Sequence, residues 1–176
     1  MTIAPSAPTV HGRCLSLAEL GAVVEGYAES VRAGNHVAEF RTDRRWHVRI
    51  HQDEDVEVWL ISWTTEQGTE LHDHGGSSGA FTVVHGALNE YVWTDDGGGR
   101  GLLVNQLRRE REVVAFGADY VHDVRNHHEA SAVSVHAYSP PIRLMRYYDT
   151  VTTSLVHTGS SWTDDPEAPA PEREAS

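Results

Sequence analysis

Cysteine is almost absent from the sequence, because Cys14 is the only one among 176 residues. A single cysteine cannot form a disulfide within the chain, and structural disulfides belong to oxidising compartments. The N-terminal residues, MTIAPSAPTVHGR, also lack the basic start and apolar core of a secretory signal. We therefore expect a protein of the reducing cytoplasm.

Basic side chains are few as well. Arginine and lysine together number 14 against 26 aspartates and glutamates, which gives a formal net charge of −12. Nucleic acid and anionic membranes attract proteins of the opposite charge, so neither is expected as a partner. No apolar run approaches the roughly 20 residues that a membrane-spanning helix needs. We expect a monomer or a weak homo-oligomer.

The overall composition is that of one globular domain. Apolar residues make up 39% of the chain and charged residues 23%, over a length typical of a single domain. Residues 1–15 show no periodicity and are predicted to form a flexible arm, followed by a single domain over residues 16–158. Residues 159–176 are acidic and proline-rich, with little apolar surface to bury, so this tail is predicted to be disordered.

One helix is predicted near the N-terminus, over residues 17–33. Ser16 and Glu19 have the spacing of a capping box, in which each side chain satisfies a backbone N–H of the other. Apolar residues follow at helical intervals, and Gly34 ends the pattern. The apolar stripe of this helix is expected to pack on the outside of a sheet.

From Arg45 onward the side chains alternate between apolar and polar, which indicates β-strands. Turns rich in glycine and aspartate separate the strands. Many short strands after one helix favour an all-β sandwich or barrel. The predicted strands cover residues 46–51, 56–64, 79–85, 88–93, 101–108, 112–116, 120–124, 132–138 and 142–150.

Histidine is abundant, with 12 residues, and two of them form the motif His72-Asp-His74. Side chains two residues apart on a strand leave the same face, so both imidazoles could bind one metal ion. Their nitrogens would lie at roughly 2.0–2.1 Å from an ion such as zinc. The alternative is two surface histidines near a turn, since so much histidine produces about one such pair by chance.

Residues 68–86, GTELHDHGGSSGAFTVVHG, resemble the first motif of a cupin barrel, in which a glycine-rich opening leads to His-x-His and a glycine ends the hairpin. The resemblance implies a double-stranded β-helix, or jelly-roll, fold. His122, between Gly117 and Asn126, matches the histidine of the second cupin motif. In a barrel its strand would lie beside that of His72 and His74, which makes His122 the third candidate metal ligand.

Three further histidines are weaker candidates. His127 and His128 follow closely, but residues 126–129 form a predicted turn in which alternation does not fix the direction of a side chain. Both are therefore expected to face solvent. His85 stands at the end of a predicted strand and is assigned no role.

Cupins commonly add a glutamate four or five residues after the His-x-His motif, but here those positions are Ser78 and Gly79. Three neutral imidazoles leave the full charge on the metal and three coordination positions open. Such a centre suits a thiolate and dioxygen, and iron(II) is the usual metal where oxygen is activated. Metal binding would also deprotonate the thiol, whose free pKa is about 8.5.

The run SVHAYSPP at residues 134–141 resembles a motif of the cysteine dioxygenase family, and the likeness extends over roughly residues 44–149. It implies that His136 and Tyr138 lie beside the iron as catalytic residues. Independently, alternation places Ser134, His136 and Tyr138 on one strand face, where buried polar groups would need partners. The alternative is a solvated outer face.

The resemblance carries two further implications. Some family members crosslink the tyrosine to a cysteine, but the matching position here is Gly79, so this chain resembles the bacterial type that lacks the crosslink cysteine. The family also tends to have a cis Ser-Pro peptide bond, here Ser139–Pro140, and only X-Pro bonds adopt the cis form at low cost.

The carboxylate of a substrate needs a cation, and the guanidinium fork suits it best. The family places an arginine on an early strand, and Arg49 is the expected match, with Arg44 and Arg45 as alternatives. Alternation groups Arg49 with His47 and His51 on a face that either lines a pocket or meets water. Further substrate-binding residues implied by the resemblance are Trp63, Ile61 and Ser134.

The resemblance as a whole implies a non-haem iron(II) thiol dioxygenase that oxidises L-cysteine with O2 to cysteine sulfinic acid. Its nearest alternative is the same reaction on 3-mercaptopropionate or another small thiol. A non-enzymatic cupin that only binds metal is a second alternative. A different cupin enzyme, such as an isomerase or a zinc or nickel protein, is a third.

Overall fold

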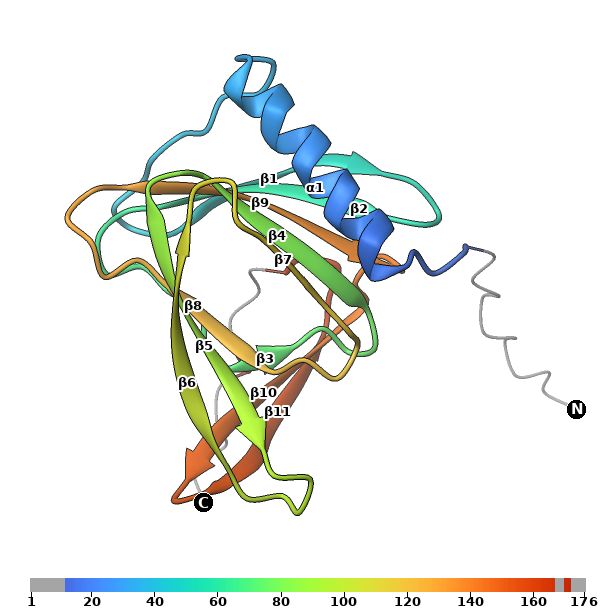
Figure 1. The fold of residues 1–176 in the computed structure, drawn as a ribbon, viewed down its shortest axis with the longest axis vertical. Coiled ribbons are helices and arrows are strands. Elements are labelled where there is room, and N and C mark those ends of the chain that lie inside the picture. The colour runs from blue at the N-terminus through green and yellow to red at the C-terminus, as the bar shows by residue number, and fades with distance from the viewer. Residues whose placement is uncertain (1–11, 167–169, 172–176) are drawn as a thin grey trace, which may run out of the picture.

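The computed structural model describes residues 12–166 and 170–171 (Figure 1). No helix in these residues is long and apolar enough to cross a membrane. The described chain forms one helix and 11 strands: α1 (Leu17–Arg32), β1 (Trp46–Gln52), β2 (Glu57–Trp63), β3 (His72–Asp73), β4 (Ser78–His85), β5 (Ala87–Asp95), β6 (Gly101–Arg109), β7 (Val113–Phe116), β8 (His122–Arg125), β9 (Ala132–Ser139), β10 (Leu144–Val151) and β11 (Ser154–Trp162).

The strands form two antiparallel sheets. One has the order β1-β2-β9-β4-β7, and the other has the order β11-β10-β3-β8-β5-β6. Neighbours in each sheet are often distant in sequence, as with β2 and β9, so the chain crosses repeatedly between the sheets. This arrangement agrees with the predicted all-β barrel with one helix at its N-terminus.

Helix α1 begins and ends close to the predicted residues. Ser16 N donates to Glu19 Oε2 at 2.8 Å, and Glu19 N donates to Ser16 Oγ at 3.3 Å, which completes the capping box. Leu20 and Val24 are fully buried against the outer face of the five-stranded sheet (Figure 1). The predicted packing of this helix on the outside of a sheet is therefore confirmed. Burial of each such side chain stabilises the fold by about 1.5–3 kcal/mol.

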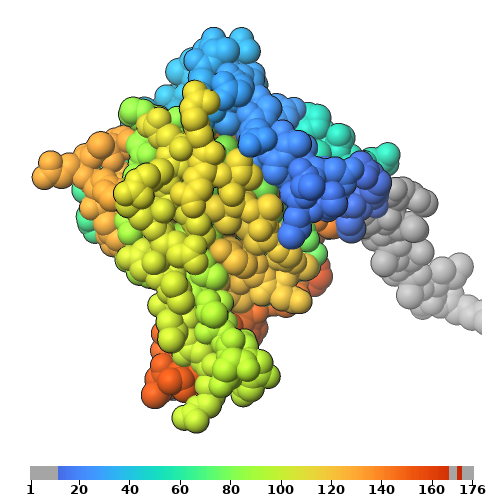
Figure 2. All heavy atoms as spheres, in the orientation of Figure 1, coloured from blue at the N-terminus to red at the C-terminus, as the bar shows by residue number. Residues whose placement is uncertain are grey.

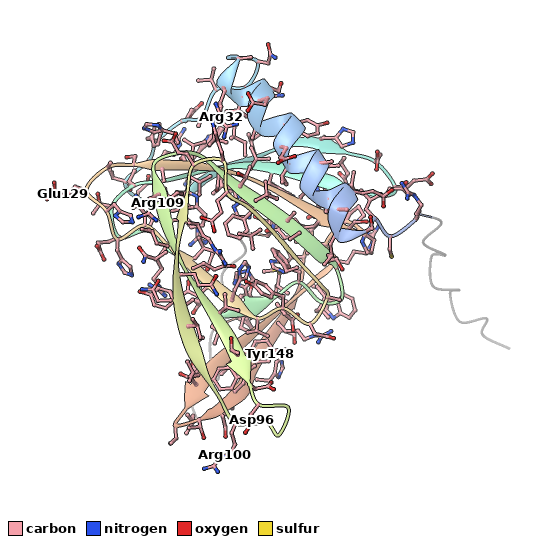
Figure 3. The ribbon with its side chains drawn as sticks, viewed as in Figure 1. Arg32, Asp96, Arg100, Arg109, Glu129 and Tyr148 are labelled. Atoms are coloured by element: carbon pink, nitrogen blue, oxygen red, sulfur yellow. The ribbon has the colours of Figure 1, made fainter. Side chains whose placement is uncertain are left out.

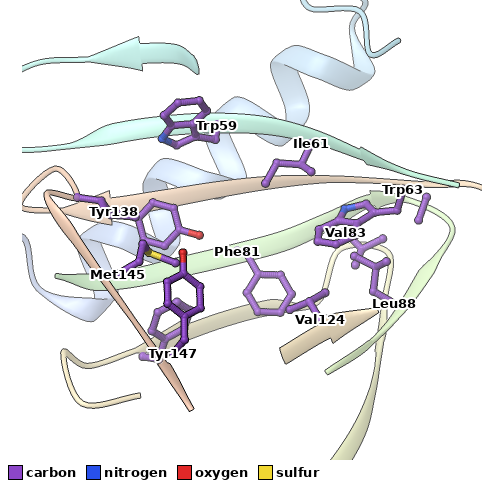
Figure 4. Close-up of a cluster of buried hydrophobic side chains, with 13 residues drawn as sticks. Trp59, Ile61, Trp63, Phe81, Val83, Leu88, Val124, Tyr138, Met145 and Tyr147 are labelled. Carbon is purple, nitrogen blue, oxygen red and sulfur yellow. The ribbon is translucent and has the colours of Figure 1, made fainter. Parts of the chain in front are cut away.

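A second apolar cluster, called the inner cluster here, fills the space between the two sheets (Figure 4). Trp63, Phe81 and Ile61 are fully buried in it. All seven residues of β2 are buried, because odd-numbered side chains face the inner cluster and even-numbered ones face α1. Buried side chains of the inner cluster therefore fill the interior of the barrel.

Two hairpins extend beyond the inner cluster, β5–β6 and β10–β11, and their tips lie side by side (Figure 1 and Figure 2). Gly101 N donates to Thr153 O at 2.8 Å and joins them. Asp96 and Arg100 lie at the tip of the β5–β6 hairpin (Figure 3).

The structure corrects several predicted boundaries. The predicted strands 120–124 and 142–150 are shifted to β8 (His122–Arg125) and β10 (Leu144–Val151), and β11 was not predicted. The strand expected to carry His72 and His74 is the short β3, which ends at Asp73. Edge strand β11 carries few apolar side chains and is held by main-chain pairing with β10, which leaves no apolar pattern to detect.

The predicted disordered tail, residues 159–176, needs a correction. Strand β11 continues to Trp162, which pairs with Leu144, and residues 163–166 and 170–171 are also placed. The prediction was based on the lack of apolar side chains, but backbone hydrogen bonds and ion pairs hold this segment. Residues 1–11 of the predicted arm, and residues 167–169 and 172–176 of the tail, lie outside the described residues.

Candidate metal centre and substrate pocket

The three predicted metal ligands lie together inside the barrel. His72 on β3 pairs directly with His122 on β8, and His74 follows β3 in the next loop. One ring nitrogen from each lies within 4.8 Å of those from the other two, and no carboxylate of the described residues joins this cluster. All three side chains are buried. The sheet register thus brings together residues that lie some 50 positions apart.

Hydrogen bonds indicate which nitrogen of each ring faces the cluster. His72 Nδ1 lies 2.6 Å from Glu70 O, and His122 Nδ1 lies 2.7 Å from Glu90 Oε1. Both partners are acceptors, so each Nδ1 carries the proton and each Nε2 keeps its lone pair. His74 Nε2 is buried without a hydrogen-bond partner among the described residues. A buried polar atom without a partner is costly, and a metal ion would satisfy it.

Two of these imidazoles, His72 and His74, are neutral at physiological pH. Burial lowers the pKa of His72 to about 3, and the neighbouring His122 acts in the same direction. Burial also lowers the pKa of His74 well below its ordinary value. Neutral imidazole is the form that binds metal, so the donor set fits a divalent transition metal.

Glu90 on β5 is part of this centre and was not among the predicted site residues. Its side chain is completely buried, and its Oε1 accepts from both His122 Nδ1 and Tyr120 OH, the latter at 3.0 Å. Arg108 Nε donates to Oε2 at 2.7 Å. Burial by itself would raise the pKa of Glu90, but the bonds from His122 and Arg108 outweigh it and lower that pKa.

A signal for Glu90 was present in the sequence. Leu88, Glu90 and Val92 alternate along β5, and the two apolar residues of this series are buried. A carboxylate on an apolar strand face needs a buried partner, which predicts a functional or structural network.

A second chain of polar side chains runs along β9 and begins at Trp63. Trp63 Nε1 donates to Ser134 Oγ at 2.9 Å, and Ser134 Oγ lies 2.9 Å from His136 Nε2. Tyr138 OH lies 3.3 Å from His136 Nδ1. All four residues are buried, so the expected inward direction of this strand face is confirmed.

The proton positions follow from the donor at the start of this chain. An indole N–H can only donate, so Ser134 Oγ accepts from Trp63 and directs its own proton to His136 Nε2. His136 Nδ1 then donates to the Tyr138 oxygen, and Tyr138 can donate its own O–H to another group. Burial lowers the pKa of His136 to about 3, which keeps this ring neutral. The ring of Tyr138 packs against that of His74, with centroids 4.7 Å apart.

Gly79 lies directly opposite Tyr138 in the sheet. A Cβ atom at this position would lie 2.6 Å from the ring of Phe116 and 3.0 Å from Tyr138 Cδ1. The position is therefore next to the tyrosine, as the resemblance implied, but packing leaves no space for a side chain. The Ser139–Pro140 bond is cis, as predicted.

Arg49 faces the interior of the barrel, on β1. It lies opposite Trp59, and its guanidinium is 5.0 Å from the centroid of the Trp59 ring. Its Nη1 contacts Glu57 Oε2 at 3.3 Å and Asp164 Oδ2 at 3.2 Å. His47 shares this face, but a β-bulge turns His51 to the helix side, where its ring lies 5.7 Å from that of Tyr27. The predicted grouping of His51 with Arg49 was wrong for this reason.

The two alternative arginines differ in position. The side chain of Arg44 is exposed and lies 3.9 Å from Asp43, so it is directed away from the interior. Arg45 lies over the Trp63 ring at 5.3 Å. Burial and then the neighbouring His122 have the largest lowering effects on the pKa of His72, and the positive charge of Arg45 lowers it further. Arg45 therefore remains an alternative carboxylate-binding residue.

The remaining predicted residues are also placed. Ile61 and Trp63 are both in the inner cluster (Figure 4). His127 is exposed and lies 3.5 Å from Glu66, as expected for a solvent-facing residue. His128 is only half exposed, and its Nε2 is buried, so its predicted exposure was overestimated. His85 is exposed at its strand end.

Comparisons with known proteins agree with this geometry. A family model described as cysteine dioxygenase type I matches residues 8–151. The chain is 25% identical over 144 residues to cysteine dioxygenase type 1 of Bos taurus, covering 78% of this chain and 72% of that protein. It is also 25% identical over 141 residues to the Rattus norvegicus protein of the same name, covering 77% and 70%.

Among solved structures, a Thermus thermophilus protein matches with a TM-score of 0.50 and 18% identity, over 58% of this chain and 90% of that one. An RmlC-like cupin protein from Desulfovibrio desulfuricans matches with a TM-score of 0.50 and 17% identity, over 61% and 92%. At these identities the similarity concerns the fold alone, and it is the cupin fold.

Proposed function

This chain belongs to the cysteine dioxygenase type I family, and on that premise we propose that it is a non-haem iron(II) thiol dioxygenase. The favoured substrate is L-cysteine, which would be oxidised with O2 to cysteine sulfinic acid. The main support is the cluster of His72, His74 and His122, which lacks a carboxylate and lies against Tyr138.

The metal would be held by the three Nε2 atoms. Bound iron(II) would supply Lewis acidity toward the thiol and the redox chemistry that dioxygen requires. Glu90 fixes the ring of His122 through its Nδ1, and Phe116 stacks on His74 with centroids 5.4 Å apart. These contacts hold the ligand set in place and keep water away from it.

The other residues would bind and orient the substrate. Arg49 would hold its carboxylate, while Ile61, Trp63 and Ser134 belong to the wall behind His136. Tyr138 would donate a hydrogen bond beside the three-histidine cluster, and His136 would hold that hydroxyl in position. In the overall reaction both atoms of O2 end on the sulfur and the thiol loses its proton, which gives a sulfinate.

Oxygen consumption tests this proposal. The protein is charged with iron(II) without air and then mixed with oxygenated L-cysteine, 3-mercaptopropionate or cysteamine. We expect one O2 consumed per L-cysteine, with cysteine sulfinate identified by mass spectrometry. Faster turnover of 3-mercaptopropionate would select the alternative substrate. No thiol-dependent uptake would favour a cupin that only binds metal, and metal analysis of the purified protein would reveal zinc or nickel.

A further inference from the structure

The described residues beyond β11 are anchored to the barrel by hydrogen bonds and ion contacts. We call residues 163–166 together with Ala170 and Pro171 the C-terminal strap. Thr163 N donates to Arg143 O at 3.1 Å, and Ala170 N donates to Glu70 Oε2 at 2.9 Å. Pro166 is buried, and Ala170 packs against the inner cluster. The strap is therefore held against Arg143, Glu70 and the inner cluster.

Two carboxylates of the strap contact β1. Asp164 Oδ2 lies 3.2 Å from Arg49 Nη1, and Asp165 Oδ1 lies 3.2 Å from His47 Nε2. Arg49 and His47 are opposite Trp59 and Ile61 in the sheet, and directly opposed residues share a face. Because Trp59 and Ile61 belong to the inner cluster, the strap carboxylates occupy the inward-facing side of β1.

The two carboxylates on Arg49 differ in how easily they can be replaced. Glu57 is completely buried, and its Oε1 also accepts from Ile142 N at 2.9 Å, so it is fixed in the fold. The Asp164 side chain is 69% exposed. An exposed ion pair is weak, and water or another carboxylate can replace Asp164 at little cost.

We propose that the C-terminal strap is a displaceable cover of the substrate pocket, in which Asp164 and Asp165 compete with the substrate's carboxylate for Arg49 and His47. This inference rests on the proposed function in one respect, that Arg49 receives a carboxylate. A thiol that carries a carboxylate can displace the strap, because its carboxylate takes the place of that of Asp164 on Arg49. A thiol without a carboxylate cannot replace Asp164 in this way.

Kinetics of a charge-neutralised strap test the competition. In the D164N/D165N variant of the iron(II) protein, the KM for L-cysteine and 3-mercaptopropionate should fall by about 3- to 10-fold, the range expected for loss of the Asp164–Arg49 ion pair and the Asp165–His47 contact. The kcat should change by less than about twofold, because the two substitutions act on the contacts with Arg49 and His47, and neither of these is a candidate metal ligand. The KM for cysteamine, which has no carboxylate, should not fall.

The matched control is D95N/D96N, which removes the aspartate that ends β5 and the adjacent Asp96 at the hairpin tip (Figure 3). There Asp95 and Asp96 accept from Gly97 N and Gly98 N, and asparagine keeps both bonds. This control has the same change in net charge and should leave every KM unchanged. An unchanged or raised KM for L-cysteine in D164N/D165N, or an equal fall for cysteamine, would overturn the proposal.

Hydrogen exchange separates failure of the strap from failure of the proposed function. If none of the proteins oxidises a thiol, the proposed function is wrong, and exchange alone decides the strap. The amides of Thr163 and Ala170 should then exchange at least several-fold faster in D164N/D165N than in the unchanged protein or in D95N/D96N. Equal exchange in all three proteins would show that the contacts of Asp164 and Asp165 with Arg49 and His47 do not hold the strap.

Discussion

At the scale of single residues, buried carboxylates and hydroxyls determine what the three imidazoles can do. Glu90 is the clearest case, because its buried carboxylate accepts hydrogen bonds from His122, Tyr120 and Arg108. A histidine ligand fixed in this way presents its other nitrogen in one direction, which is what metal binding requires.

Replacement of Glu90 by glutamine should weaken metal binding. The bond to His122 loses its charge and Arg108 keeps only Glu112 as a counter-ion, so we expect iron(II) affinity to fall by about 10- to 100-fold. Anaerobic titration with iron(II) measures this. The control is E129Q, in an exposed loop (Figure 3). If E90Q does not fold, Tyr120→Phe provides the test, because it removes one hydrogen-bond donor to Glu90 and should weaken iron(II) binding by a few-fold. Unchanged iron(II) affinity in every variant that folds would contradict this role of Glu90.

Replacement of Tyr138 by phenylalanine should affect turnover and not metal content. Its hydroxyl is bonded to His136 and its ring packs on His74, but it is not among the three metal-binding candidates. We expect kcat with L-cysteine to fall by about 100-fold, a typical loss for one positioned proton donor. Tyr91→Phe on β5 is the control. A Tyr138→Phe enzyme of normal kcat would remove Tyr138 from the catalytic residues.

At the scale of elements, the pairing of β4, β7 and β9 sets the space around Tyr138. Gly79 is opposite both Phe116 on β7 and Tyr138 on β9, so three strands meet at one point. The Phe116 ring also stacks on His74. A displacement of the Phe116 ring would therefore also move His74, one of the three candidate metal ligands.

A cysteine introduced at Gly79 should destabilise the protein. The Cβ would lie 2.6 Å from Phe116, and such overpacking typically costs about 1–3 kcal/mol. Urea unfolding measures the loss. Gly117→Cys is the matched control, because nothing lies within 4 Å of a Cβ there. Equal stability of the two variants would mean that Phe116 moves aside without cost.

At the scale of the whole molecule, the buried histidines make stability depend on pH. Burial holds the pKa of His72 and of His136 at about 3, against an ordinary value of 6.5. Below pH 6.5 the unfolded chain therefore binds protons that the folded chain excludes, so the free energy of unfolding falls as pH falls toward 3. The pKa of His74 is lowered as well, and with these three groups the slope reaches about 4 kcal/mol per pH unit.

Urea unfolding of the metal-free protein at a series of pH values from neutral to about 5 measures this slope. The His136→Gln variant keeps polar atoms for Ser134 and Tyr138 but cannot take up the proton, so about a third of the slope should disappear. His85→Gln, at an exposed position, is the control and should leave the slope unchanged. A steep slope that persists in His136→Gln would show that other groups cause the acid lability.

The sequence by itself determined those features that repeat at the short period of one element. The capping box of Ser16 and Glu19, the pair His72 and His74, and the shared face of Ser134, His136 and Tyr138 all follow from helical or strand geometry within a few residues. The sequence also shows that positions 78 and 79 carry no acidic residue. The capping box, the histidine pair and the shared strand face are all found in the structure.

Only the tertiary structure decided which distant residues meet. Glu90 lies 32 positions from His122, and Asp164 lies 115 from Arg49. Such contacts depend on strand register and bulges, and one bulge is enough to move His51 from the face of Arg49 to that of α1. Periodicity fixes the side of a strand from which a residue points, but the partner on that side is set by packing energy summed over both sheets.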